Sequence, residues 1–338
     1  MSGLSKVPTR GGEQEVRPQG RGATDLELVN QILDLPLPSQ LRTYRDMATL
    51  SLAEAFLNTQ RNAAIKWIER SQNVELKARF RELATSSFLA TQAVSHISPS
   101  NRAQPNSVVM THSAQGFVVT GKAQWVTGFK RADYFTVGVE LGEGLQSVVL
   151  IPKARQGVSI GEHSSLDVLK ESETGWVSLQ NVLVHADEIL LEPECHIVTH
   201  ENGSLARPYP ALHTSALALG HAIACLNAVE AHRESILIQD WSERLAVKIE
   251  ETWDTVERLA SKAFGEVRTE PYEEVRASAN AISFQSAALL GMAARGHGLL
   301  MTSPSGKLVA ESRFFLVWGN SQRAEELTLR KILTNSTI

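Results

Sequence analysis

Two side chains whose types suit a flat ligand stand close together in the middle of the chain, Trp125 and Thr127. Gly121 and Gly128 bracket them and permit tight bends. Because the two residues are two positions apart on a predicted short strand, we expect their side chains to share one face. An aromatic surface beside a hydroxyl suits a planar, polar-edged ligand such as a flavin ring. The alternative is a half-buried hairpin strand, which the residues taken alone favour.

The composition argues against several classes of partner. The 338 residues carry a net charge of −4, so the chain offers no broad positive field for nucleic acid. We expect no membrane span, because no apolar run approaches the ~20 residues that a span needs, and we see no signal peptide. Cys195 and Cys225 lack metal-binding spacing, which fits a cytoplasmic protein without a metal site.

The elements that must position Trp125 and Thr127 change in character along the chain. Residues 1–23 are rich in Gly, Pro and Arg and predict a flexible tail. Residues 24–90 predict a helical N-terminal domain, 91–195 an antiparallel β-barrel or sandwich, and 205–338 a C-terminal four-helix bundle. The predicted helices run over about 39–70, 74–86, 211–238, 241–265, 272–302 and 305–334. The fold class is therefore α+β and multidomain.

This order of domains, with the central motif, resembles the acyl-CoA dehydrogenase superfamily across roughly residues 25–335. Asp187–Leu190 and the helix with Leu219-Gly220 are also similar to family segments. The resemblance implies FAD at the junction of β domain and bundle, an acyl-CoA or similar small-molecule substrate, and a homodimer or homotetramer. It also implies that a carboxylate removes a proton while a hydride passes to the flavin. The family pattern G-x-x-x-W-I-T-N-A-x-x-A-D is matched by Gly121, Trp125, Val126, Thr127, Gly128, Ala132 and Asp133.

The resemblance assigns flavin contacts to five residues of the β domain. Trp125, Val126 and Thr127 match the segment that packs beside the flavin, and Ser95 takes the place of a family Thr that contacts its edge. Asn101 takes the place of a Ser near the pyrophosphate, and a polar loop with ordinary turn chemistry is an equal alternative for it. The usual glycine, serine and aspartate of this loop are missing. Two further family segments for the adenine side have no counterpart here.

The proton-abstracting base of the family is absent. Trp318 stands where the family has its catalytic Glu, and Pro210 stands where some members place a Glu on the first bundle helix. The histidines best placed to approach the site are His96, in the flavin loop, and His213, near the start of the first bundle helix. A histidine base is reasonable because its pKa is near neutrality. For His213 a structural role is favoured, since a lone His on an apolar helix is usually packed.

Three functions remain open. The first is a flavoprotein oxidoreductase that acts on an acyl thioester or related small molecule without the usual Glu. The second is an FAD- or FMN-dependent monooxygenase or oxidase of the same fold, which needs no such base. The third is a non-catalytic scaffold that has lost flavin chemistry. Phe314–Val317 is apolar on all sides and must be buried within the chain or at a subunit interface.

Overall fold

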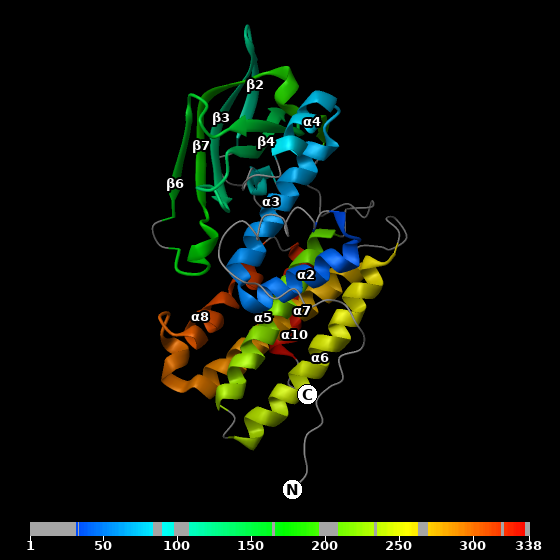
Figure 1. Cartoon of the computed structure of the whole chain (residues 1–338), viewed down its shortest axis with the longest axis vertical. Coiled ribbons are helices and arrows are strands. Elements are labelled where there is room, and N and C mark those ends of the chain that lie inside the picture. The colour runs from blue at the N-terminus through cyan, green and yellow to red at the C-terminus, as the bar shows by residue number, and fades with distance from the viewer. Residues whose placement is uncertain are drawn as a thin grey trace.

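A sheet domain and a helical bundle stack end to end in the computed structural model, and one long helix runs between them (Figure 1). This arrangement confirms the α+β fold class. The positions of the domain boundaries stay a prediction. The structure describes residues 32, 34–83, 90–97, 108–163, 166–195, 209–232, 235–262, 270–318 and 321–334. The predicted flexible tail and Asn101 lie outside these residues.

Three helices precede the sheet: α2 (Leu37–Leu50), α3 (Leu52–Arg70) and α4 (Val74–Leu83). The prediction of one helix over 39–70 is wrong at Ser51, which is extended, with φ −157°. The Ser51 hydroxyl accepts a hydrogen bond from the backbone N–H of Glu54 at 3.3 Å and so caps a new helix. The chain therefore turns between α2 and α3.

Helix α3 belongs to two hydrophobic cores. Its first half places Leu52, Ala55 and Phe56 in the core of the helical bundle. Its second half places Ala64 and Ile68 in a separate cluster with α4 and the β domain, which includes Phe80, Val148 and Leu150. Because the middle of α3 lies between these cores, its central residues face the junction of the two domains.

The β domain is one eight-stranded sheet with the order β6-β7-β3-β2-β4-β5-β8, and β1 pairs with β4. Most neighbours are antiparallel, and β1 and β2 each run parallel to β4. The two short strands predicted on either side of Gly121 form a single strand, because bulges at this glycine (φ 143°) and before Val126 absorb the bends. The strands are β1 (Ala90–Ala93), β2 (Val109–Ser113), β3 (Gly116–Val126), β4 (Tyr134–Gly142), β5 (Leu145–Pro152), β6 (Val158–Glu162), β7 (Gly175–Val184) and β8 (Ile189–Cys195).

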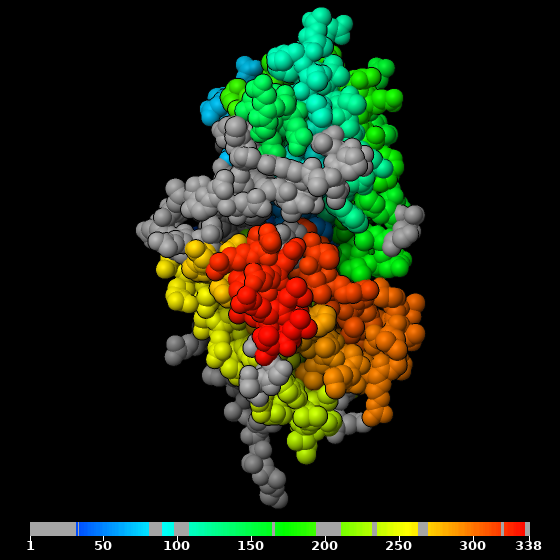
Figure 2. Space-filling model, turned by 180° about the vertical axis from the view of Figure 1, so that it is seen from behind, coloured from blue at the N-terminus to red at the C-terminus, as the bar shows by residue number. Residues whose placement is uncertain are grey.

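The bundle has three long helices followed by shorter ones. The prediction of one helix over 305–334 is wrong, because two serines each begin a new helix there. The Ser303 hydroxyl accepts a hydrogen bond from the backbone N–H of Gly306 at 2.9 Å, and the Ser321 hydroxyl accepts one from that of Ala324 at 3.1 Å. Figure 2 shows α10 on the outer face and the segment with α8 meeting the sheet domain at one edge. The helices are α5 (Tyr209–Val229), α6 (Ile236–Ala260), α7 (Glu270–Ala294), α8 (Pro304–Glu311), α9 (Phe314–Val317) and α10 (Gln322–Leu333).

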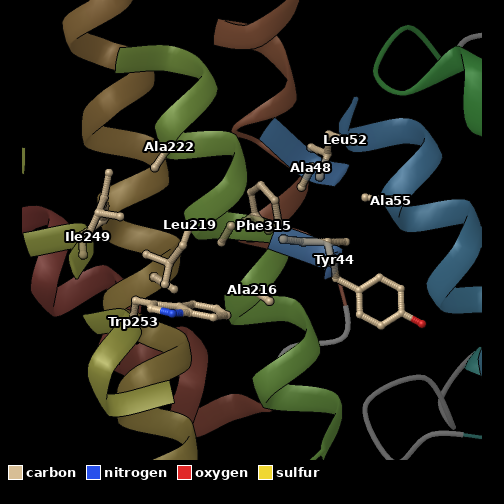
Figure 3. Packing of buried hydrophobic residues seen from close by; sticks show 14 of the residues in the cluster. Tyr44, Ala48, Leu52, Ala55, Ala216, Leu219, Ala222, Ile249, Trp253 and Phe315 are labelled. Atoms are coloured by element: carbon tan, nitrogen blue, oxygen red, sulfur yellow. The ribbon is translucent and has the colours of Figure 1, made fainter. Parts of the chain in front are cut away.

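Helix α5 forms the centre of the bundle, where Ala216, Leu219 and Ala222 pack against Ile249 and Trp253 of α6 (Figure 3). Within the described residues, Ala211–Val229 is long and apolar enough to cross a membrane, and 78% of its most apolar window is buried inside the protein. The expectation that no apolar run reaches such a length is therefore wrong for this helix.

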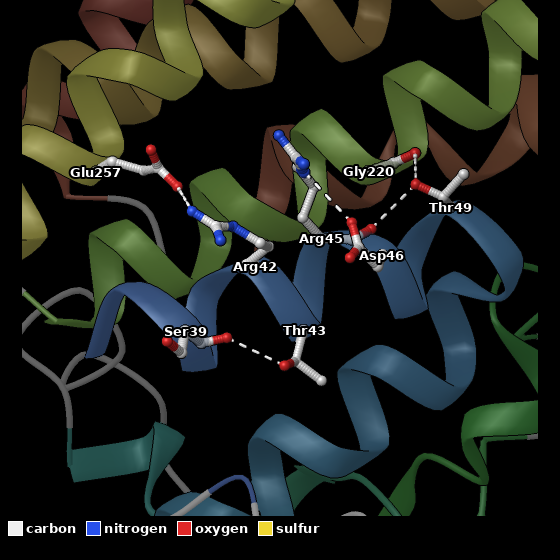
Figure 4. A network of polar contacts seen from close by, with 8 residues as sticks. All are labelled: Ser39, Arg42, Thr43, Arg45, Asp46, Thr49, Gly220 and Glu257. Atoms are coloured by element: carbon white, nitrogen blue, oxygen red, sulfur yellow. Dashed lines mark hydrogen bonds and ion pairs between the residues drawn. The ribbon is translucent and has the colours of Figure 1, made fainter. Parts of the chain in front are cut away.

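Helix α2 lies across α5 and α6 and is held there by polar contacts (Figure 4). Arg42 pairs with Glu257 at 2.5 Å, and Arg45 lies over the Trp253 ring at 4.1 Å. The Thr49 hydroxyl donates to the Gly220 carbonyl at 3.2 Å. A Cβ on Gly220 would lie 2.2 Å from the carbonyl oxygen of Arg45, so only glycine permits this close approach.

Candidate functional site

Backbone strain is concentrated where β3 ends. Trp125, Leu169 and Glu173 all adopt left-handed conformations, with φ of 59°, 57° and 48°. The last two flank the short 3-10 helix η3 (Lys170–Ser172). The N–H of Gly128 donates to the Ser172 and Glu173 carbonyls at 2.9 and 3.0 Å, which joins η3 to the end of β3. Strained non-glycine residues cluster at functional sites more than elsewhere, so this end of the sheet is the candidate site.

Trp125 presents its indole outside the β domain. Its side chain is 55% exposed, and the ring stacks on His163 with centroids 4.3 Å apart and planes 29° from parallel. Thr127 is 1% exposed, and Val126 belongs to the core of the sheet. The predicted shared face of Trp125 and Thr127 is therefore wrong. The bulge before Val126 shifts the alternation of the strand and turns Trp125 away from Thr127.

The Thr127 hydroxyl is part of an internal chain of hydroxyl groups. It lies 2.9 Å from the Thr174 hydroxyl, which lies 2.8 Å from that of Ser172. The Thr127 carbonyl accepts from the Thr91 hydroxyl at 2.6 Å. These bonds fix the end of β3 against β1 and η3, so the Trp125 indole stands on a rigid support.

Ser95 and His96 follow β1 in the 3-10 helix η1 (Ser95–Ile97). The Ser95 hydroxyl donates to the carbonyl of Gln124, next to Trp125, at 3.1 Å. His96 is buried, and its Nε2 lies 2.7 Å from the Gly138 carbonyl, so Nε2 carries the proton. Its Nδ1 has no hydrogen-bond partner among the residues that the structure describes. Burial lowers the pKa of His96, opposed by the bond to Gly138, so burial favours the neutral ring.

Helix α3 connects this end of the sheet to the bundle. On the sheet side, the Gln92 amide of β1 donates to the Gln60 side-chain carbonyl at 2.8 Å. On the bundle side, the Phe56 ring packs edge-on against Trp318 and Phe314, each at 4.7 Å between centroids. Trp318 and Phe314 stack at 4.9 Å. Trp318, which the sequence resemblance matches to the family Glu, is thus part of an aromatic wall with Phe56 and Phe314. In the run Phe314–Val317, Phe315 is buried within the chain, whereas Val317 is 77% exposed, so for Val317 only the interface alternative remains.

A buried arginine stands behind this wall. Arg276 of α7 donates to the Trp318 carbonyl at 2.5 Å and to the Thr214 hydroxyl of α5 at 2.9 Å. Burial lowers the pKa of Arg276 to about 9. The neighbouring His213 packs edge-on against Tyr44 with centroids 5.4 Å apart. The structure therefore places His213 beside α2.

Sequence reasoning missed a set of polar residues in α3, although a signal was present. Asn58, Thr59, Gln60, Arg61 and Asn62 are consecutive, and every one is less than a tenth exposed. A helix with one solvated face cannot produce such a run, because consecutive residues point in all directions. Five polar residues in a row inside an otherwise apolar helix indicate a helix surrounded by protein at that point.

A second buried polar group lies in the bundle below η3. The His221 ring contacts the Ser283 hydroxyl at 2.8 Å and the Leu308 carbonyl at 2.9 Å, and burial lowers its pKa to about 4. Glu311 is buried 3.9 Å from the Lys307 ammonium, which also binds Glu171 of η3 at 2.7 Å. Burial raises the pKa of Glu311 to about 7. This cluster ties the bundle to the strained end of the sheet. Within the described residues, no group of three His, Cys, Asp or Glu side chains is placed to hold a metal.

Comparisons with known proteins bear on the fold and on one segment. No family model matches the chain. A dibenzothiophene monooxygenase from Rhodococcus erythropolis is 28% identical over 125 residues, which span 35% of this chain and 30% of that protein. The butyryl-CoA dehydrogenase from Megasphaera elsdenii superposes with a TM-score of 0.72 over 90% of this chain and 88% of its own, at 16% identity. The chain therefore has the fold of the acyl-CoA dehydrogenases.

A monooxygenase also superposes on this chain. The dibenzothiophene monooxygenase TdsC from Paenibacillus sp. A11-2, solved with FMN and indole, superposes with a TM-score of 0.65 at 17% identity, over 92% of this chain and 87% of that one. Members of the superfamily fold thus include both dehydrogenases and monooxygenases, and the fold alone does not choose between them.

Proposed function

We propose that this protein is a flavin-dependent oxidoreductase that carries out a monooxygenase-type reaction on a small molecule. The observation that carries the proposal is Trp318. By the sequence resemblance, Trp318 takes the position of the carboxylate that dehydrogenation of an acyl thioester requires, and its indole packs against Phe56 and Phe314. The similarity to two dibenzothiophene monooxygenases supports the same choice. Oxidation of an acyl-CoA thioester is the less favoured reaction of this scaffold.

The residues of the site fit a flavin in part. The half-exposed Trp125 indole, which stacks on His163, offers a planar surface, and its backbone is strained. The Ser95 and Thr127 hydroxyls are engaged inside the β domain, so in this arrangement they support the indole and do not face a ligand. FAD is the expectation from the sequence, and FMN is the flavin solved with TdsC. A bound flavin would supply the redox-active ring at this site.

The chain's own residues would then position the ring and shape its surroundings. Trp125 would stack on one side of the ring, on the support that Thr127, Thr174 and Ser172 provide. Phe56, Phe314 and Trp318 would give the substrate side an apolar wall. Such a wall excludes water, which protects reactive oxygen chemistry from side reactions.

Flavin binding and reaction type are tested in two steps. First, the purified protein is incubated with FAD or FMN and passed through a desalting column, and visible flavin bands must remain with the protein. Second, the loaded protein is mixed with butyryl-CoA without air. Bleaching of the bands would establish a dehydrogenase and refute our choice of reaction. For the proposed reaction, the reduced, loaded protein is mixed with oxygen and indole or dibenzothiophene, and mass spectrometry must detect an oxygenated product. Failure to bind either flavin would leave the scaffold alternative.

Assembly into a homodimer or homotetramer is part of the proposal. Met292 near the end of α7 and Leu299, Leu300 and Met301 beyond it are exposed together, and exposed apolar side chains that gather in one place commonly mark an interface. Light scattering of the wild type and of Leu299→Asp tests this assignment. The wild type should have at least twice the mass of one chain, and the variant should dissociate.

A further inference from the structure

Lys307 of α8 lies between two carboxylates whose surroundings differ. Its ammonium nitrogen lies 2.7 Å from a carboxylate oxygen of Glu171 in η3 and 3.9 Å from one of Glu311, a turn further along α8. The Glu171 side chain is 55% exposed, whereas that of Glu311 is 4% exposed. Only the first distance is short enough for a hydrogen bond. In this arrangement the ammonium therefore bonds to the exposed carboxylate and not to the buried one.

The long helices packed against α8 offer Glu311 no cation. Helix α5 contributes His221 and Cys225. Burial lowers the pKa of His221 to about 4, so its ring is neutral near pH 7. Burial, reinforced by the charge of Glu311, raises the pKa of Cys225, so the thiol keeps its proton. The part of α7 that runs alongside, residues 277–294, contains no charged side chain.

Two short 3-10 helices beside α8 carry the remaining charged groups. The helix η6 (Arg295–Leu299) contributes Arg295 and His297, and both are exposed. The helix η3 contributes Glu171 and Lys170, and the Lys170 ammonium is 3.0 Å from Asp167. The hydrogen bond from Lys307 lowers the pKa of Glu171, so this carboxylate is ionised near neutral pH. Lys307 is therefore the cation at hand for both carboxylates.

The bond between Lys307 and Glu171 connects the bundle to the support of Trp125. Glu171 is the middle residue of η3, and the next residue, Ser172, accepts a hydrogen bond from the N–H of Gly128 at 2.9 Å. Gly128 follows Trp125 by three positions at the end of β3. Figure 2 shows that the segment with α8 meets the sheet domain at this edge. A change in the partner of Lys307 is therefore felt where the indole is held.

We propose that Lys307, Glu171 and Glu311 form a pH-dependent link, in which loss of the Glu311 proton to solvent draws the Lys307 ammonium from Glu171 to the buried carboxylate and lets η3 open. A buried carboxylate that ionises needs a hydrogen-bonded cation, because an unpaired buried charge is strongly unfavourable. Burial raises the pKa of Glu311 to about 7, with Lys307 opposing and Glu171 reinforcing the shift. Glu311 is therefore mostly protonated at pH 6, where η3 is held, and mostly ionised at pH 8, where η3 is released.

Hydrogen–deuterium exchange of the full chain without flavin tests the link. The amides of Ser172 and Glu173 donate to the carbonyls of Leu169 and Lys170 at 2.9 and 3.0 Å, so their exchange reports the opening of η3. Their protection factors, which are corrected for the direct effect of pH on exchange, should fall about two- to fivefold from pH 6 to pH 8, as expected for loss of an exposed ion pair. Unchanged protection would mean that the ammonium serves both carboxylates at once, and would overturn the proposal.

Three variants assign the effect to these groups. Glu311→Gln keeps the shape of the side chain and cannot ionise, so η3 should stay protected at both pH values. Lys307→Met removes the shared cation, so protection should be low at both. Histidine commonly changes charge near neutral pH, so His297→Gln is the matched control, and its protection should fall with pH as in the wild type. If Glu311→Gln keeps the fall, or His297→Gln loses it, the link is refuted.

The consequence for flavin affinity rests on the proposed function, because it requires a flavin on Trp125. Coupling between proton and flavin is reciprocal, so the wild type should bind flavin about two- to fivefold more tightly at pH 6 than at pH 8 relative to Glu311→Gln. The two proposals can fail separately. Protection that falls with pH in a protein that takes up no flavin would reject the proposed function alone. Flavin binding with protection that does not change with pH would reject the link alone.

Discussion

The guanidinium of Arg276 donates to the carbonyl oxygen of Trp318 at 2.5 Å. Its second bond, to the Thr214 hydroxyl at 2.9 Å, reaches the start of α5. One buried cation thus fixes Trp318, which by the sequence resemblance takes the position of a catalytic carboxylate, and it fixes the start of α5 as well. Trp318 is therefore held by the bond from Arg276 to its carbonyl and by ring contacts with Phe56 and Phe314.

Arg276→Ala should therefore be among the most damaging substitutions in the bundle. It leaves the Trp318 carbonyl and the Thr214 hydroxyl without this donor, and it opens a cavity. We expect a loss of about 3–5 kcal/mol in the free energy of unfolding, measured by urea denaturation. Arg258→Ala, which removes an exposed arginine of α6, should change it by less than about 0.5 kcal/mol. Similar losses of unfolding free energy in the two variants would show that the buried bonds of Arg276 stabilise the fold no more than an exposed arginine does.

Trp125→Gly should separate ligand binding from stability. Glycine relieves the left-handed backbone, and the substitution also removes the stack on His163. The free energy of unfolding should therefore change by less than about 1 kcal/mol. Loss of the planar surface should weaken flavin binding at least about tenfold, since stacking on an aromatic side chain is worth about 1–3 kcal/mol. Glu143→Gly relieves the same kind of strain, φ 51°, in an exposed turn and should leave flavin affinity unchanged.

Glu311 should make the protein less stable as the pH rises. Burial raises its pKa to about 7 in the folded state, against an ordinary value of 4.5, with Lys307 opposing and Glu171 reinforcing the shift. The folded state therefore binds more protons between these values, and the contribution of the protonated group is lost as the pH rises through about 7. Glu311→Gln should equal the wild type at pH 4 and exceed it by about 3 kcal/mol at pH 8. Chemical denaturation at both pH values measures the difference, and a constant difference would contradict this account.

His96 offers a matched pair of substitutions that reports its tautomer. Gln places an amide where Nε2 lies and can keep the bond to the Gly138 carbonyl, whereas Asn places its amide near Nδ1 and cannot. At pH 8 we expect His96→Asn to be less stable than His96→Gln by about 1–2 kcal/mol in thermal or urea unfolding. The reverse order would mean that Nδ1 makes the bond that matters.

The order of helices, sheet and bundle could be predicted because apolar spacing and domain order are properties of long segments. The predictions that depended on single residues were less successful. Ser51 splits one predicted helix into two through a single cap. A one-residue bulge before Val126 turns Trp125 to the outside and leaves Thr127 inside. The polar run of α3 was missed because polar side chains on a helix normally face water, and its burial depends on three elements that are distant in sequence.

Helix α3 has a consequence for how the molecule unfolds. The bundle core includes Phe56, and the cluster beside the sheet includes Ile68, so neither core is complete without the same continuous helix. Two domains joined by a loop can melt separately, but two domains that share a helix lose it together. We therefore expect a single heat-absorption peak whose calorimetric and van't Hoff enthalpies agree. Damage to either core should then lower the melting temperature of the whole chain.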